Sequence, residues 1–133
     1  MLFYKTFIKR GDYNIVKLWK KDYLYKTFIG AIDYKINYNN IKIEYMEISN
    51  TLNDDDEMDA NKSLIGFVKD LGKDLDKNKI IVDVHENLIV YHKYYMNEGF
   101  IITNNKCIDN PSWIQSEYIF KNNIKFQFQK ASL

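Results

Sequence analysis

The spacing of apolar residues changes near the middle of the chain, and this change predicts a sheet followed by alternating helices and strands. Before position 50, β-branched and aromatic residues recur in short runs that favour strands. The predicted strands cover residues 2–8, 13–19, 25–38 and 41–48. Gly11-Asp12 and Asn39-Asn40 are turn signals between these runs. The first part of the chain is therefore expected to form an antiparallel meander.

Two of these strands carry further expectations about local structure. In the run 41–48, Ile41, Ile43 and Tyr45 are predicted to share one face because strand side chains alternate. The even-numbered residues would share the other face. The segment 16–25 has an alternative interpretation as a short helix, since its apolar residues also fit a helical spacing.

After position 60 the apolar residues recur at intervals of three and four, which predicts an amphipathic helix over 62–75. Asn61 or Ser63 would cap its start. A strand at 80–84 and a helix at 88–96 follow, and Gly99 is expected in the left-handed conformation that ends helices. Residues 100–103 and 116–121 complete the predicted strands. The expected fold class is α+β, with a mixed, mostly antiparallel sheet of six to seven strands in one domain spanning 1–133.

Composition narrows the class of partner. The formal net charge is +1, which does not indicate a globally basic nucleic-acid-binding protein. No apolar run approaches the roughly 18 residues of a membrane span. Cys107 is the single cysteine, so an intramolecular disulfide is excluded and a cytoplasmic location is expected. No cluster of His, Cys, Asp and Glu has metal-ligand spacing, so no metal site is predicted.

The sequence Tyr94-Tyr95-x-x-x-Gly99-Phe100 closes the second predicted helix. This motif, with the correctly spaced helix, strand and helix before it, resembles the core of the GNAT N-acetyltransferase superfamily. The resemblance spans about residues 26 to 121. It divides the domain into N-terminal strands at 1–39, a cofactor-binding core at 40–100 and C-terminal strands at 101–133. A reduced helical region is expected between the first two strands, where GNAT enzymes usually have one or two helices.

The resemblance implies acetyl transfer from acetyl-coenzyme A to an amine by direct attack. Tyr95 matches the position of the family's frequent general acid, and Glu47 matches a position where some members have a general base. Ile48 and Ser49 would contact the pantetheine arm through their backbone. The alternatives are a tyrosine that packs a helix on the sheet and a solvated glutamate at the end of a strand.

The resemblance also places the phosphate-binding loop at residues 56–61, where the chain departs from the family pattern. Glu57 and Asp59 replace two glycines whose small size lets backbone N–H groups approach a diphosphate. A like-charge pair about 4 Å apart costs about 1 to 4 kcal/mol, depending on the local dielectric. Asn61, Lys62 and Ser63 could instead offer N–H groups at the helix start, with Lys62 supplying positive charge.

Two functional hypotheses therefore stand after the sequence is read. The first is an acetyl-coenzyme A-dependent N-acetyltransferase acting on an unidentified amine. The second is a GNAT-fold protein without catalysis that serves as an interaction or structural module, since fold alone does not determine function. A homodimer is a further possibility because residues 123–129 alternate apolar and polar side chains and could pair as an edge strand.

Overall fold

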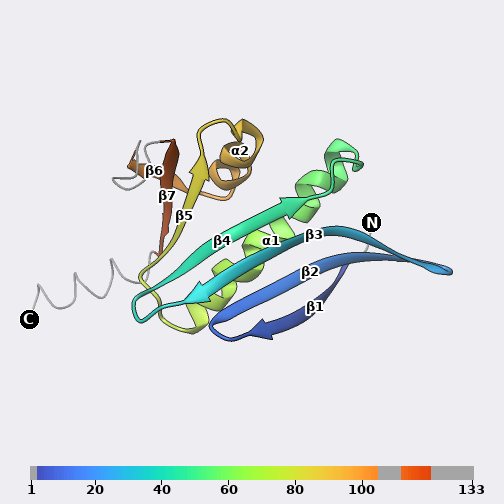
Figure 1. The fold of residues 1–133 in the computed structure, drawn as a ribbon, viewed down its shortest axis with the longest axis horizontal. Helices are drawn as coiled ribbons and strands as arrows, with labels where there is room; N and C mark the ends of the chain where they lie inside the picture. The colour runs from blue at the N-terminus through green and yellow to red at the C-terminus, as the bar shows by residue number, and fades with distance from the viewer. Residues whose placement is uncertain (1–2, 105–111, 121–133) are drawn as a thin grey trace, which may run out of the picture.

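A computed structural model of the protein describes residues 3–104 and 112–120, which form one sheet with two helices (Figure 1). The elements are β1 (Phe3–Arg10), β2 (Tyr13–Asp22), β3 (Tyr25–Ile36), β4 (Asn40–Ile48), α1 (Asp54–Asp74), β5 (Lys79–His85), α2 (Ile89–Asn97), β6 (Ile101–Asn104) and β7 (Trp113–Ile119). Within these residues the seven strands have the order β1-β2-β3-β4-β5-β7-β6. The β4–β5 pair is parallel and the other described pairs are antiparallel. The predicted α+β class and mostly antiparallel sheet are confirmed.

The N-terminal region consists of strands, with no helix between β1 and β2. This agrees with the expectation of a reduced helical region there. Gly11 and Asp12 alone join β1 to β2, and Gly11 has a φ of 58°, which glycine adopts without strain. The alternative helix at 16–25 is wrong, because β2 continues to Asp22. Val16 and Leu18 are both fully buried, so the apolar residues here follow the two-residue period of a strand.

The first helix begins earlier than its apolar spacing predicted. Asn53 is its N-cap, and the Asn53 side chain accepts a hydrogen bond of 2.8 Å from the backbone N–H of Asp56. The first turn contains Asp54, Asp55, Asp56 and Glu57, whose negative charges are favourable at the positive end of a helix dipole. The expected start at residues 61–63 is therefore wrong.

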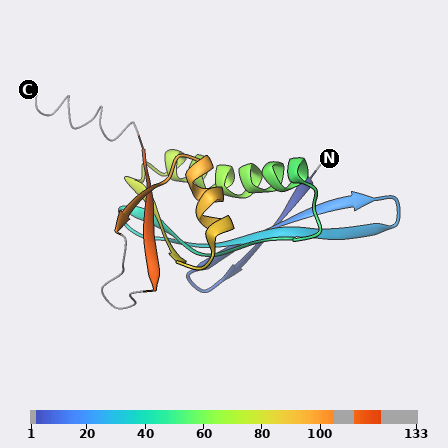
Figure 2. The same ribbon diagram turned by 90° about the horizontal axis from the view of Figure 1, so that it is seen from above.

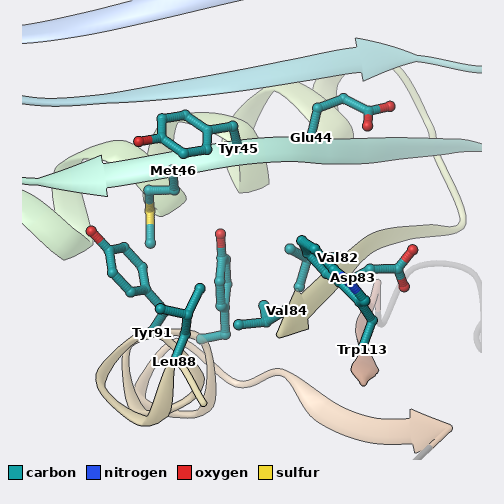
Figure 3. Close-up of a pocket in the computed structure, with 10 residues that line it drawn as sticks. Glu44, Tyr45, Met46, Val82, Asp83, Val84, Leu88, Tyr91 and Trp113 are labelled. Carbon is teal, nitrogen blue, oxygen red and sulfur yellow. The ribbon is translucent and has the colours of Figure 1, made fainter. Parts of the chain in front are cut away.

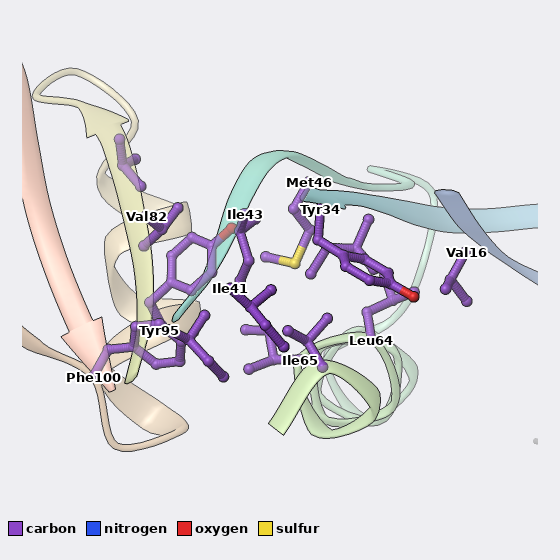
Figure 4. Close-up of a cluster of buried hydrophobic side chains, with 14 of the residues drawn as sticks. Val16, Tyr34, Ile41, Ile43, Met46, Leu64, Ile65, Val82, Tyr95 and Phe100 are labelled. Carbon is purple, nitrogen blue, oxygen red and sulfur yellow. The ribbon is translucent and has the colours of Figure 1, made fainter. Parts of the chain in front are cut away.

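The main core lies between α1 and one face of β2, β3 and β4 (Figure 2). Leu64, Ile65 and Val68 of α1 are fully buried there, and burying such a side chain contributes about 1.5 to 3 kcal/mol each. Figure 4 shows that this cluster continues past β4 to Tyr95 and Phe100, which pack beside β5. One continuous core therefore extends from β2 to β5 and α2.

A register shift in β4 corrects the predicted faces of that strand. Ile43 pairs with Tyr34 of β3, but the next pair joins Tyr45 to Asp33, so Glu44 is an extra residue. Such a bulge reverses the alternation of side chains beyond it. Ile43 is buried, whereas Tyr45 is 54% exposed and the next residue is buried. Tyr45 therefore does not share a face with Ile43, and the end of β4 presents side chains that a regular strand would point the other way.

Two glycines, one in β3 and one in α1, should respond oppositely to replacement by alanine. A Cβ at Gly30 of β3 would lie 2.6 Å from the carbonyl oxygen of Glu47, whereas a Cβ at Gly66 of α1 would meet nothing within 4 Å. Gly30→Ala should therefore destabilise the protein by about 1 to 3 kcal/mol, because β3 and β4 must separate. Gly66→Ala should stabilise it by about 0.5 to 1 kcal/mol, because alanine favours the helix. Urea unfolding of both variants measures the difference, and equal stability of the two would contradict this account.

Candidate active site

The strands β4 and β5 separate beyond the bulge and leave a wedge between them. Their parallel pairing runs only from Asn40 opposite Lys79 to Ile43 opposite Val82. The last five residues of β4 therefore do not pair with the last three residues of β5. Helix α2 follows β5 after a short connection and closes the wedge from one side (Figure 3).

A cavity of about 130 Å³ occupies this wedge (Figure 3). It is lined by Glu44, Tyr45 and Met46 of β4, Val82, Asp83 and Val84 of β5, Leu88, Tyr91, Tyr95 and Trp113. Its walls are mainly apolar and aromatic, as in most small-molecule sites. Pockets that hold a whole ligand of drug size have volumes of roughly 300 to 1,000 Å³. The cavity therefore has room for a narrow chain or the end of a larger molecule.

Tyr95 is the most deeply buried polar side chain of this wall. The residue is 3% exposed, and its ring extends from α2 toward β4 (Figure 4). Its ring also packs on Phe100, with the two centroids 5.2 Å apart. Among residues 3–104 and 112–120, its hydroxyl has no hydrogen-bond partner. Burial, and secondarily the nearby Tyr91, raises the pKa of Tyr95, so its phenol keeps its proton at neutral pH.

Glu47 lies beside the cavity rather than in its wall. Its side chain is half-buried near the end of β4, where the hydroxyl of Tyr45 donates to its carboxylate at 3.3 Å. Tyr45 itself lines the cavity, so this hydrogen bond connects Glu47 to the cavity wall. Asp33 of β3 is a second carboxylate in this region: its pKa is raised by burial and by the negative charge of Glu47, while Lys17 acts in the opposite direction.

The backbone groups predicted to hold a pantetheine arm already have partners. The N–H of Ile48 donates to the hydroxyl of Tyr91 at 3.1 Å, and the N–H of Ser49 donates to the carbonyl of Ile29 at 2.8 Å. The Ser49 hydroxyl is also 2.8 Å from that of Thr51. Tyr91 would have to rotate away before a ligand could bind the Ile48 N–H, whereas the Ser49 N–H is part of the sheet.

The remaining predicted cofactor ligands lie within α1. Asn61, Lys62 and Ser63 are in the third turn, so their N–H groups lie in the body of the helix rather than at its open start. Asn61 is 3% exposed; its amide donates to the carbonyl of Tyr94 at 3.1 Å, and its side-chain oxygen has no hydrogen-bond partner among the described residues. Lys62 is exposed. None of the three lines the cavity.

The start of α1 carries the Asn53 side-chain cap and several carboxylates. The bond of 2.9 Å from the Glu57 N–H to the Asn53 carbonyl is the first backbone bond of the helix. The hydroxyl of Tyr94 on α2 donates to the Glu57 carboxylate. Burial, together with this hydrogen bond and the charge of Glu57, raises the pKa of Tyr94. An anion approaching this turn would meet carboxylates before it met free N–H groups.

Sequence reasoning did not identify Tyr91 and Tyr45 as parts of the site. Tyr91 lies on the second helix, where its ring stacks edge-on against Tyr94 with centroids 5.3 Å apart. Its contact with Ile48 joins residues 43 positions apart, which no local pattern signals. Tyr45 was assigned to the wrong face because the bulge at Glu44 leaves no mark in the alternation.

The described part of the chain contains neither a metal-binding cluster nor a membrane-spanning helix. Among the described residues, no group of three or more His, Cys, Asp and Glu side chains is placed to hold a metal ion. The helices of the described region are too short or too polar to cross a membrane. Cys107 and the predicted edge strand at 123–129 lie outside the described residues.

Comparison with solved structures identifies the architecture. A structure of a domain from Methanocaldococcus jannaschii DSM 2661 matches with a TM-score of 0.68 and 18% identity, covering 84% of this chain and 69% of that one. The PaiA N-acetyltransferase from Thermoplasma acidophilum, solved with coenzyme A, matches with a TM-score of 0.65 and 17% identity over 82% of this chain and 62% of that one. The chain has the GNAT fold.

The same comparison adds a structure solved with acetyl coenzyme A. The N-acetyltransferase PseH from Campylobacter jejuni, in complex with acetyl coenzyme A, matches with a TM-score of 0.61 and 13% identity over 83% of this chain and 70% of that one. The GNAT-fold chain described here spans 62% to 69% of the length of the first structures it matches. No protein-family model matches the sequence, and a search of curated proteins finds no significant match.

Proposed function

We propose that this protein transfers an acyl group from a thioester to an amine, with acetyl-coenzyme A as the donor. The observation that carries the proposal is the cavity between the separated ends of β4 and β5, into which the unpartnered hydroxyl of Tyr95 is directed. GNAT-fold neighbours solved with coenzyme A or acetyl coenzyme A support the choice of donor.

The residues present suit one end of this donor better than the other. The mainly apolar wedge and the Ile48 N–H offer a narrow channel that fits an acylated pantetheine arm. The acidic, capped start of α1 does not fit a diphosphate. When bound, acetyl-coenzyme A supplies a thioester carbonyl that an amine can attack and a thiol that can leave.

Tyr95 is proposed to donate from its hydroxyl to the sulfur that leaves. Because burial raises its pKa, Tyr95 stays protonated and cannot act as a base at neutral pH. A protonated phenol in an apolar wall is a hydrogen-bond donor, and such a donor stabilises negative charge that develops in front of it. Reprotonation of the thiolate by this group is the general-acid role that the resemblance implies.

Glu47 is proposed to accept the proton of the amine, directly or through water. Glu47 is half-buried, and its carboxylate accepts a hydrogen bond from Tyr45, which lines the cavity, so a cationic amine bound beside the cavity could reach it. Asp33 adds negative charge to the same region and would favour a cationic acceptor over a neutral or anionic one. The identity of that amine is left open.

The other residues predicted to bind the cofactor lie in two places, at the end of β4 and within α1. Ile48 would bind the arm through its N–H once Tyr91 rotates, and Ser49 would contribute its hydroxyl or carbonyl, since its N–H pairs with Ile29. The cofactor contacts predicted for Asn61, Lys62 and Ser63 are not used in this proposal, because all three lie in the body of α1 and outside the cavity. A cytoplasmic location and a homodimer through 123–129 remain predictions.

Thermal melting in the presence of thioesters tests the proposal. A ligand at a hundred times its dissociation constant adds about 2.7 kcal/mol of stability, so the melting temperature should rise with acetyl-coenzyme A or with S-acetylpantetheine. Release of free thiol on adding a panel of primary amines would then establish transfer. If neither thioester raises the melting temperature at millimolar concentration, the enzyme proposal is wrong and a non-catalytic module becomes the better explanation.

A further inference from the structure

The start of α1 presents an arrangement opposite to that of an anion site. Helix starts bind phosphate because free N–H groups and the positive end of the dipole point at the ligand. Here the Asn53 side chain accepts a hydrogen bond from the Asp56 N–H, so one of the N–H groups that a helix start leaves open is already bonded. Asp54 and Asp55 are exposed in the same turn.

The negative charge of this turn is not neutralised by neighbours. Among the described residues, the ion pairs are Lys42 with Asp83 and Lys79 with Glu117, and neither involves the first turn of α1. The Glu57 carboxylate is engaged instead by a neutral phenol, that of Tyr94. A diphosphate placed here would therefore meet several uncompensated carboxylates.

The wedge between β4 and β5 differs from the acidic start of α1. Its lining is mainly apolar and aromatic; of its two carboxylates, that of Asp83 pairs with Lys42 at 2.7 Å and that of Glu44 belongs to an exposed residue. At the edge of the wedge the Ile48 N–H and the Tyr91 hydroxyl form a neutral polar pair. These two groups match the amides and hydroxyl of a pantetheine arm, which are also neutral donors and acceptors. The hydroxyl of Tyr95, 3% exposed and unpartnered in the described region, marks the inner end of the channel.

We infer that this site recognises its acyl donor by the neutral acyl-pantetheine end alone, and that the first turn of α1 opposes the donor's diphosphate. The inference rests on the proposed function. It implies that the nucleotide half of acetyl-coenzyme A adds no affinity. A thioester without that half, such as S-acetylpantetheine, is then a donor of equal or higher affinity.

Titration calorimetry with both thioesters tests this inference by binding, independently of turnover. The dissociation constant of S-acetylpantetheine should lie within about threefold of that of acetyl-coenzyme A or below it, because no phosphate contact is made. Raising the salt concentration should tighten acetyl-coenzyme A alone, because salt screens repulsion between like charges. Tighter binding of acetyl-coenzyme A by more than tenfold would overturn the inference while leaving the proposed function intact.

A charge variant locates the repulsion. Asp54→Asn combined with Asp55→Asn should tighten acetyl-coenzyme A by about three- to tenfold and leave S-acetylpantetheine unchanged. Asp70→Asn is the matched control, because Asp70 is exposed on the same helix but about 24 Å from its start. That distance exceeds the screening length of about 8 Å at physiological salt.

The remaining outcomes separate the two proposals. An unchanged affinity for acetyl-coenzyme A in the Asp54→Asn, Asp55→Asn variant, together with no effect of salt, would overturn the inference. Absence of binding by either thioester at millimolar concentration would overturn the proposed function and the inference with it. Equal tightening by the Asp70→Asn control would show a general charge effect and would also count against the inference.

Discussion

Replacing Tyr95 by phenylalanine should lower the rate of acyl transfer by about a hundredfold or more, because a positioned acid contributes roughly 10² to 10⁴ in rate. The substitution removes one hydroxyl from a residue that is 3% exposed and leaves the ring contact with Phe100 in place. Since that hydroxyl has no partner among the described residues, its removal should neither unfold the protein nor weaken thioester binding. Turnover and calorimetric affinity measured on the same preparation separate the two effects.

Tyr34→Phe is the matched control for this variant. Tyr34 is 5% exposed, and burial raises its pKa as well, but it packs near Phe67 in the core under α1, away from the residues that line the cavity. Loss of its hydroxyl should leave turnover unchanged. If Tyr95→Phe retains full turnover, Tyr95 only packs α2 on the sheet, and its proposed role is wrong.

Replacing Leu64 by alanine should lower the free energy of unfolding by about 2 to 5 kcal/mol, the range for large-to-small changes in closed cores. Leu64 is fully buried at the contact between α1 and the sheet, and its Cδ1 would lie 3.2 Å from a Cβ at Gly30. The facing backbone is strand β3, which cannot move in to fill the space without breaking its pairs to β2 and β4. Most of the lost volume should therefore remain as a cavity.

Thermal and urea unfolding measure this loss, with Leu75→Ala as the control. Leu75 is the C-cap of the same helix and is 45% exposed, so truncation there should cost under about 1 kcal/mol. For a chain of this length, a kilocalorie per mole shifts the melting temperature by about 3 to 5 °C. Similar losses at both positions would mean that α1 is not packed as described.

The order of strands and helices could be predicted because it depends on the spacing of apolar residues within each segment. Alternating apolar residues before position 50 and three-to-four spacing after position 60 determined the strands, the helices and their succession. The spacing up to Gly99 and Phe100 then indicated the fold, and Gly99 indeed has a φ of 91°. These are features of single segments, which the sequence displays directly.

The start of α1 could not be placed by the same reasoning. Four consecutive acidic residues carry no apolar period, so the helix appeared to begin at Lys62. Physically the acids and Asn53 are a strong helix start, with a cap and a favourable dipole interaction. Matching this segment to a phosphate loop obscured that signal, although the residues themselves contained it.

The cavity could not be predicted because it depends on contacts between distant segments. The bulge at Glu44 is defined by the pairing of β4 with β3, and the wedge by the loss of pairing with β5. The contact of Tyr91 with Ile48 joins α2 to β4. Such features require the tertiary structure, so Tyr95 could be proposed from its motif while its neighbours could not.

Amide resonances of the isotopically labelled protein, titrated with S-acetylpantetheine, test most directly whether the wedge is the donor site. The account predicts that the amide of Ile48 shifts because it exchanges its Tyr91 partner for the ligand, with further shifts at Val84 and Tyr91. The amide of Gly66, which is in α1 and does not line the cavity, should not move. Saturable shifts confined to other parts of the sheet, or no shift at millimolar ligand, would contradict the account.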